Sequence, residues 1–70
     1  MKLLFENSKG IERVIAFPNS EEEAIEEIHK FAKERNFKIY YMRMWDENGM
    51  RHYDIGSHSE FFRLKLENDT

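Results

Sequence analysis

The sequence predicts an α+β protein with one helix packed on one face of an antiparallel sheet of four or five strands, in the order ββαββ(β). Apolar residues within 20–36 recur at helical spacing, and those in the flanking segments alternate with a period of two. Residues with turn chemistry separate these segments. The length of 70 residues suits one domain. We place this domain at 1–66 and expect 67–70 to be a frayed tail.

The first hairpin is predicted to join Lys2–Glu6 to Ile11–Phe17. The connection, Asn7 to Gly10, contains a glycine that can adopt the positive φ angle of a tight turn. Both faces of Ile11–Phe17 are partly apolar, which favours a strand inside the sheet over one at its edge.

The helix has start and stop signals. Ser20 and Glu23 have the spacing of a capping box, in which both side chains satisfy free N–H groups of the first turn. Asn36 suits the left-handed position after the last turn, and Phe37 can then fold back toward Ala32. An apolar stripe at helical spacing comprises Ala24, Ile25, Ile28, Phe31 and Ala32.

A block of glutamates opens this helix, at Glu21, Glu22 and Glu23, with Glu26 and Glu27 following. A solvated face matched to the positive end of the helix dipole explains the block completely. An acidic docking surface is the alternative explanation.

The second hairpin is predicted to comprise Lys38–Trp45 and Met50–Gly56, with Trp45 opposite Met50 across a four-residue loop. Phe61–Leu66 alternates in the same way and predicts a fifth strand. The segment before it is expected to form a turn, or one short helical turn capped by Ser57.

The period of two divides the second hairpin into two faces. The face expected to join the core carries Tyr40, Met42, Met44, Arg51, Tyr53 and Ile55. The opposite face carries Ile39, Tyr41, Arg43, Trp45, Met50, His52, Asp54 and Gly56. The predicted core comprises Leu4, Val14, Ala16, Ile25, Ile28, Phe31, Ala32, Tyr40, Met42, Tyr53, Ile55 and Phe62. The choice of Leu4 over Leu3 and Phe5 depends on the phase of the first strand.

The composition restricts the function classes. The chain has 11 Lys and Arg against 14 Asp and Glu, so its charge of −3 disfavours a nucleic-acid module. The absence of Cys excludes thiolate metal sites and cysteine nucleophiles, and it predicts a reducing, cytoplasmic setting. No apolar run approaches the length of a membrane span, about 18 residues. The apolar stretch at the N-terminus, Leu3 to Phe5, is too short for a signal peptide. We expect no cofactor and no small-molecule substrate, because so small a core leaves no room for a deep cleft.

Two side-chain groups contain the residue types of a site. His52, Asp54, His58 and Glu60 could supply metal ligands. Ser57 or Ser59 with His58 and Asp54 has the composition of a hydrolytic triad. Neighbours in one short turn do not reach triad geometry, and the metal-type group matches no defined spacing. We therefore predict no catalytic residues, no metal site and no enzyme activity.

One helix covers one face of a sheet, which leaves the other face to be explained. The predicted binding residues on it are Tyr41, Arg43, Trp45, Met50 and His52. Trp, Tyr, Met and Arg are enriched in protein interfaces, and aromatic and Arg side chains also stack on single-stranded bases. Three explanations remain open: cover by the chain itself, a protein interface including self-association, or a single-stranded nucleic acid bound through Tyr41, Arg43 and Trp45. The charge of −3 favours protein over nucleic acid.

Three segments carry a resemblance: Met1–Glu6, Asn19–Phe37 and Asp54–Phe62. With its Glu-rich helix and the closing DIGSHSEFF, the chain resembles small uncharacterised proteins of bacterial phages and mobile elements, especially of Firmicutes. The resemblance implies a regulator or inhibitor that binds a larger protein, and it assigns no site residue.

Overall fold

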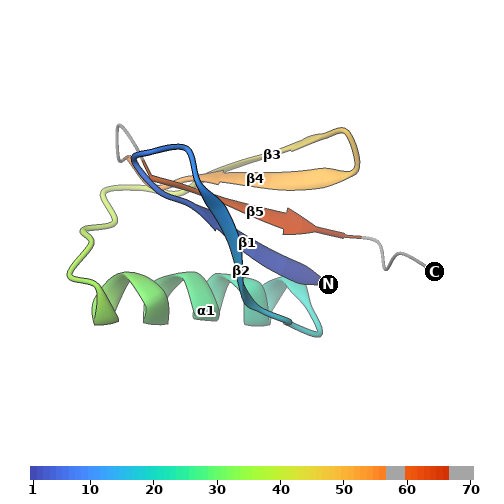
Figure 1. Cartoon of the computed structure of the whole chain (residues 1–70). Coiled ribbons are helices and arrows are strands. Elements are labelled where there is room, and N and C mark those ends of the chain that lie inside the picture. The colour runs from blue at the N-terminus through green and yellow to red at the C-terminus, as the bar shows by residue number, and fades with distance from the viewer. Residues whose placement is uncertain (57–59, 67–70) are drawn as a thin grey trace.

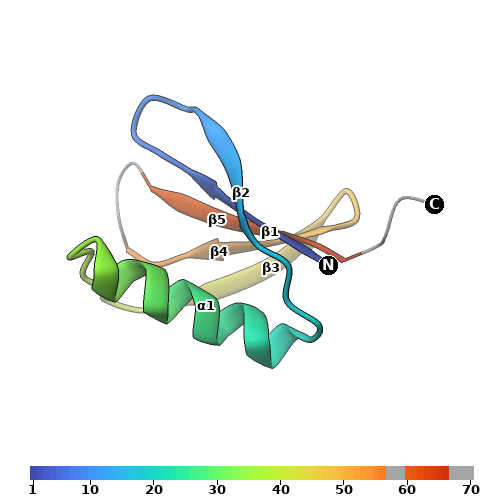
Figure 2. The same ribbon diagram turned by 60° about the horizontal axis from the view of Figure 1, so that its bottom comes forward.

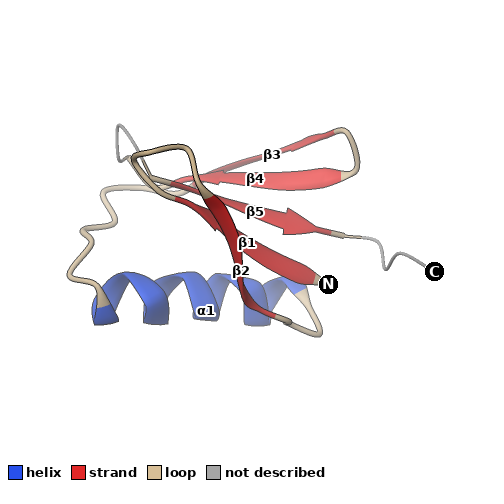
Figure 3. Ribbon diagram, in the orientation of Figure 1, coloured by secondary structure: helices blue, strands red, loops and turns tan. Residues whose placement is uncertain are grey.

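The computed structural model describes residues 1–56 and 60–66 and confirms the α+β class, with one helix and a five-stranded antiparallel sheet. The element order is β1 (Lys2–Glu6), β2 (Glu12–Ala16), α1 (Glu21–Glu34), β3 (Arg43–Glu47), β4 (Met50–Asp54) and β5 (Phe61–Lys65), as Figures 1 and 3 show. The expected tail at 67–70 lies outside the described residues, as do Ser57, His58 and Ser59 of the expected turn.

The strand order across the sheet is β2-β1-β5-β4-β3, and every neighbouring pair is antiparallel. The predicted fifth strand therefore exists, and it lies in the centre, between β1 and β4. The prediction that Ile11–Phe17 forms an internal strand is wrong, because β2 is an edge strand. The insertion of β5 beside β1 leaves β2 with a single neighbouring strand.

The Ser20 half of the predicted capping box and the stop signal at Asn36 are confirmed. Ser20 Oγ accepts a hydrogen bond from the backbone N–H of Glu23, at 3.2 Å. At the other end Asn36 has a φ of 59°, and the N–H of Phe37 donates to the carbonyl of Ala32 at 2.8 Å. This bond reaches back across the last turn and satisfies a carbonyl that the helix leaves free.

The second hairpin is tighter than predicted. Glu47, and not Trp45, pairs with Met50, and Trp45 pairs with His52. The turn consists of Asn48 and Gly49, whose φ angles of 53° and 75° are those of a type I′ turn. The difference from the predicted register is two residues, so the side chains of β3 and β4 keep their predicted faces. Ile39 was expected on the face away from the core, but it lies before β3 and packs against the core cluster.

The side of β1 that faces the core is the opposite of the predicted one. Leu3 and Phe5 are buried and lie opposite Leu64 and Phe62 of β5, while Leu4 faces the other side of the sheet. The placement of Leu4 in the core is therefore wrong.

Two further core predictions are wrong. Val14 is 41% exposed because it faces the same side as Leu4 on the edge strand, and Tyr40 is 67% exposed because it precedes β3. Ile28, Ala32, Tyr53, Ile55 and Phe62 are buried as predicted. The partly buried group comprises Ala16, Ile25, Phe31 and Met42.

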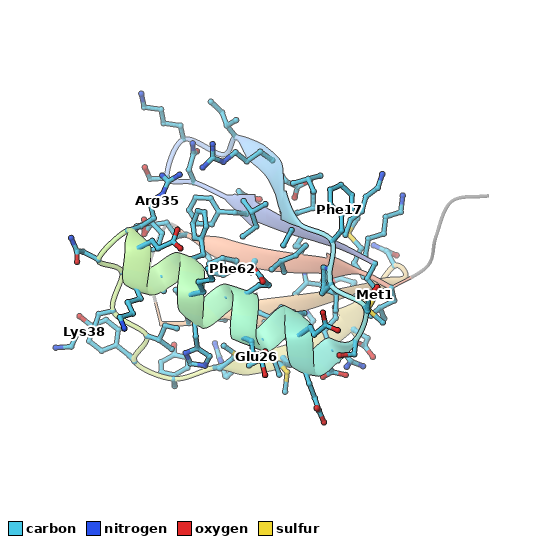
Figure 4. The ribbon with its side chains drawn as sticks, turned by 90° about the horizontal axis from the view of Figure 1, so that it is seen from below. Met1, Phe17, Glu26, Arg35, Lys38 and Phe62 are labelled. Atoms are coloured by element: carbon cyan, nitrogen blue, oxygen red, sulfur yellow. The ribbon has the colours of Figure 1, made fainter. Side chains whose placement is uncertain are left out.

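Aromatic side chains bring α1 and the sheet together. The ring centroid of Phe31 lies 4.7 Å from that of Phe5 and 5.9 Å from that of Phe62. Ala24 and Ile28 belong to the same buried cluster. Figure 2 shows α1 running along one side of the sheet, and Figure 4 shows Phe62 behind it and Phe17 beyond β2. We call the other side the open face.

Arg51 joins three elements on the helix side. Its guanidinium donates to both carboxylate oxygens of Asp46 on β3, at 2.7 and 3.1 Å, and it also contacts Glu21 in the first turn of α1. Beside this group the hydroxyl of buried Tyr53 has no hydrogen-bond partner among the described residues. Burial raises the pKa of Tyr53 to about 12.

Candidate functional site

A row of side chains crosses the open face. Trp45 on β3 lies opposite His52 on β4, and His52 lies opposite Arg63 on β5. Directly opposed residues share a face, so the three side chains stand next to one another. The tight hairpin and the central position of β5 together create this row.

Two contacts hold the row in place. The Trp45 and His52 rings are stacked, with centroids 5.3 Å apart and planes inclined by 11°. Arg63 Nε donates to His52 Nδ1 at 3.3 Å, which requires that nitrogen to be unprotonated. The indole of Trp45 thus packs against the imidazole of its cross-strand neighbour.

Arg63 connects the row to the opposite edge of the sheet. Its Nη1 donates to Glu6 Oε1 on β1 at 2.5 Å and also contacts Glu12 on β2. A hollow of about 190 Å³ lies in this region, between Trp45, His52 and Arg63. It is also lined by Glu6, Tyr53, Phe61 and Phe62. The lining thus combines aromatic rings with the ion pair between Glu6 and Arg63.

A second group lies where β3 begins. The Arg43 guanidinium carbon lies 5.6 Å from the ring centroid of Tyr41, and Arg43 Nη2 donates to Asp54 Oδ2 at 2.9 Å. The N–H of Gly56 donates to the other carboxylate oxygen, also at 2.9 Å. Arg43 and then Gly56 hold the pKa of Asp54 below its usual value.

Gly56 sets the position of the tyrosines. Its φ is 89°, and a Cβ added there would lie 2.9 Å from Tyr40 Cβ and 3.2 Å from Tyr41 Cε2. A glycine is required both for the backbone angle and for the close approach. The N–H of Tyr40 also donates to the carbonyl of Ile55, at 3.1 Å, which fixes the chain just before β3.

The predicted binding residues fall into two contact pairs and one outlier. Trp45 contacts His52, and Tyr41 contacts Arg43. Met50 lies at the far end of the hairpin, opposite Glu47. Trp45 is 43% exposed and Tyr41 49%, whereas Met50 and His52 are half-buried. Tyr41 lies before the first residue of β3, outside the strand where it was expected.

Sequence analysis missed the ionic half of this surface. The alternation of β5 places Arg63 on the open face, but its partners Glu6 and Glu12 are more than half the chain away in sequence. No local pattern links these residues, so the strand order alone brings them together. The same distance along the chain explains why the hollow beside Trp45 was not predicted.

The residues weighed as metal ligands or as a triad have other contacts. His52 contacts Trp45 and Arg63, and Asp54 binds Arg43 and the backbone of Gly56. Within residues 1–56 and 60–66, no three His, Cys, Asp or Glu side chains are grouped as a metal site. The expected approach of His58 to His52 lies outside the described residues, as do Ser57 and Ser59.

β3 forms the edge of the sheet beside these side chains. All five of its residues are exposed, and in the described part of the chain no strand pairs with its outer side. Its pairing with β4 is regular over the whole strand. β2, the other edge, contains a register shift against β1. The regular, uncovered edge is thus the one that carries Trp45.

No family model matches the chain, and no significantly similar protein was found among curated proteins or solved structures. Among the described residues, no helix has the length and apolar character needed to cross a membrane. The functional argument therefore rests on the side chains and edges of the fold.

Proposed function

We propose that the protein is a small, non-catalytic protein-binding module that acts through the open face beside β3. The binding residues are Tyr41, Arg43, Trp45, Met50 and His52. A single observation carries the proposal: the indole of Trp45 is almost half exposed, yet it is held against His52 on a fully exposed edge strand. We also propose that the protein acts in the cytoplasm as a regulator or inhibitor of phage or mobile-element origin.

The physical argument concerns the entropy of binding. A flexible surface side chain loses rotamer freedom when a partner covers it, which weakens the complex. Trp45 has already lost much of that freedom through its stack on His52. An aromatic ring fixed before binding gives its apolar area to the interface at low entropic cost, as interface anchors do.

Single-stranded nucleic acid is the alternative partner. Its phosphates require available cations, and three arginines lie on this half of the sheet. Arg43 is paired with Asp54, Arg51 with Asp46 and Glu21, and Arg63 with Glu6 and Glu12. Carboxylates thus compete with phosphate at each arginine. These pairs support a protein partner over nucleic acid.

The test compares two variants that lose exposed aromatic area. Tyr41→Ser/Trp45→Ser removes it from the proposed surface, and Phe17→Ser removes it from the end of β2, where Phe17 is 71% exposed. Association is measured by sedimentation of the pure protein and by co-purification from extracts of the native host. Circular dichroism verifies the fold of each variant.

We expect the double variant to fold and to lose association, while Phe17→Ser retains it. Association that survives in the double variant contradicts the proposal. Unfolding of the double variant would mean that Tyr41 and Trp45 support the core and would contradict their role as a binding surface. A partner removed by nuclease, with binding to single-stranded DNA or RNA that weakens as salt rises, would favour the alternative.

A further inference from the structure

The tight turn determines which backbone groups of β3 face outward. A two-residue turn is closed by a hydrogen-bonded pair, which here is Glu47 with Met50. Hydrogen-bonded and non-hydrogen-bonded pairs alternate along an antiparallel ladder. Trp45 therefore bonds to His52 of β4, and the N–H and C=O groups of Met44 and Asp46 point away from the sheet.

We propose that this edge binds the β3 edge of a second copy of the chain. The two strands run antiparallel with Trp45 at the centre, so that one continuous sheet spans both copies. This inference rests on the proposed function and names its partner. An exposed strand edge is a ready template for such pairing unless the protein blocks it.

The backbone fits this register. With Trp45 opposite Trp45 of the second copy, Met44 lies opposite Asp46. Both residues present outward N–H and C=O groups, so they can exchange both hydrogen bonds of the pair. The central tryptophans then form a non-hydrogen-bonded pair, in which side chains approach most closely.

The charges select the same register. On the open face β3 carries Arg43 at one end and Glu47 at the other, with Trp45 between them. Antiparallel pairing about Trp45 places each Arg43, which also donates to Asp54 of its own chain, opposite Glu47 of the second copy. In-register parallel pairing places like charges together. If the two antiparallel strands are shifted by two residues, Arg43 no longer faces Glu47 of the second copy. A shift in one of the two directions also places the Asp46 side chains of the two copies opposite each other.

The other edge does not fit a second copy. On β2, antiparallel pairing about Val14 places Glu12 opposite Ala16 and Arg13 opposite Ile15, without matching charges. The register shift between β1 and β2 also distorts this edge, a common protection against pairing. The edge of β3 is clear on the helix side, because Met44 and Asp46 are exposed there.

A charge exchange tests the register. In Arg43→Glu or Glu47→Arg alone, both cross-copy pairs become repulsive. An equal mixture of the two variants makes both pairs attractive again, but only between unlike chains. By sedimentation velocity we expect each variant alone to dimerise about tenfold more weakly than the unaltered chain, and the mixture to recover dimerisation.

A cysteine experiment gives a second readout, since the chain has no cysteine of its own. In the proposed register position 43 faces position 47 of the second copy, so an equal mixture of Arg43→Cys and Glu47→Cys, which keeps Trp45, should form an intermolecular disulfide under mild oxidation. Met44→Cys faces Asp46 instead and should not form one. Equal disulfide formation by the mixture and by Met44→Cys would overturn the register, and it would do so even if Arg43→Glu failed to fold.

A monomeric unaltered chain at all accessible concentrations would overturn the inference. If that monomer still captured a host protein through Trp45, the proposed function would stand without a second copy as partner. Dimerisation that is unchanged in both charge variants would also overturn it. Dimerisation and host-protein capture that both survive in Tyr41→Ser/Trp45→Ser would reject both proposals together.

Discussion

The indole of Trp45 stacks on the imidazole of His52, with ring centroids 5.3 Å apart and planes inclined by 11°. The two residues are direct partners across β3 and β4. The contact joins the exposed edge strand to the interior of the sheet. The stack restricts the rotamers open to Trp45, and the account of binding depends on this restriction.

The first prediction concerns this stack. His52→Ala should leave the indole unsupported, raise its accessibility to a soluble quencher and destabilise the protein by about 1 kcal/mol. Trp45 is the chain's single tryptophan, so its fluorescence reports on this site alone. The matched control is His29→Ala on the exposed side of α1, which should leave quenching unchanged. Equal quenching in both variants would show that the stack does not hold the ring.

The second prediction concerns acid stability. Arg43 and Gly56 lower the pKa of Asp54 in the folded protein relative to the unfolded chain. The resulting stabilisation is fully present above the pKa of the unfolded chain, about 4, and is lost as the pH falls through the lower pKa of the folded protein. Denaturant unfolding at several pH values should show a shallower acid loss for Asp54→Asn than for the unaltered chain. Identical slopes would contradict the pairing of Arg43 with Asp54.

The sequence predicted features that depend on neighbouring residues. Ser20 and Asn36 act within one turn of the helix, so their roles followed from spacing alone. Asn48 and Gly49 are also a strong local signal for a two-residue turn. The four-residue loop predicted for 46–49 is therefore replaced by a turn of Asn48 and Gly49 alone.

The sequence could not determine features that depend on strand order. Leu3, Leu4 and Phe5 are consecutive apolar residues, which fit either phase of a strand. Only the pairing with Leu64 and Phe62 of β5 selects Leu3 and Phe5 for the core. The same pairing placed Arg63 beside Glu6, and so created the ionic half of the open face.

The third prediction concerns the buried hydroxyl of Tyr53. It has no hydrogen-bond partner among the described residues, and such a group loses its hydration without compensation. Tyr53→Phe should therefore increase the free energy of unfolding by about 1 kcal/mol. Tyr40→Phe is the control: its ring is exposed, and its removal of a hydroxyl should change little. A destabilised Tyr53→Phe would indicate a partner for this hydroxyl.

The fourth prediction separates the two sides of α1. Ile28 is fully buried, and Ile28→Ala should cost about 2–5 kcal/mol, enough to unfold much of a domain this small. Glu22 is exposed, and Glu22→Gln should change the stability by less than about 0.5 kcal/mol. Thermal unfolding followed by circular dichroism measures both. Similar losses would mean that the buried stripe of the helix has been misplaced.

The most direct test of the proposed surface is site-specific photo-cross-linking in living cells. A photoreactive phenylalanine derivative replaces Tyr41 in one experiment and Phe17 in the other, so that both probes are exposed aromatic side chains. The account predicts covalent protein adducts from position 41, either with a second copy or with another protein, and few from position 17. Equal adducts at both positions, or adducts from position 17 alone, would contradict a binding surface centred on Trp45.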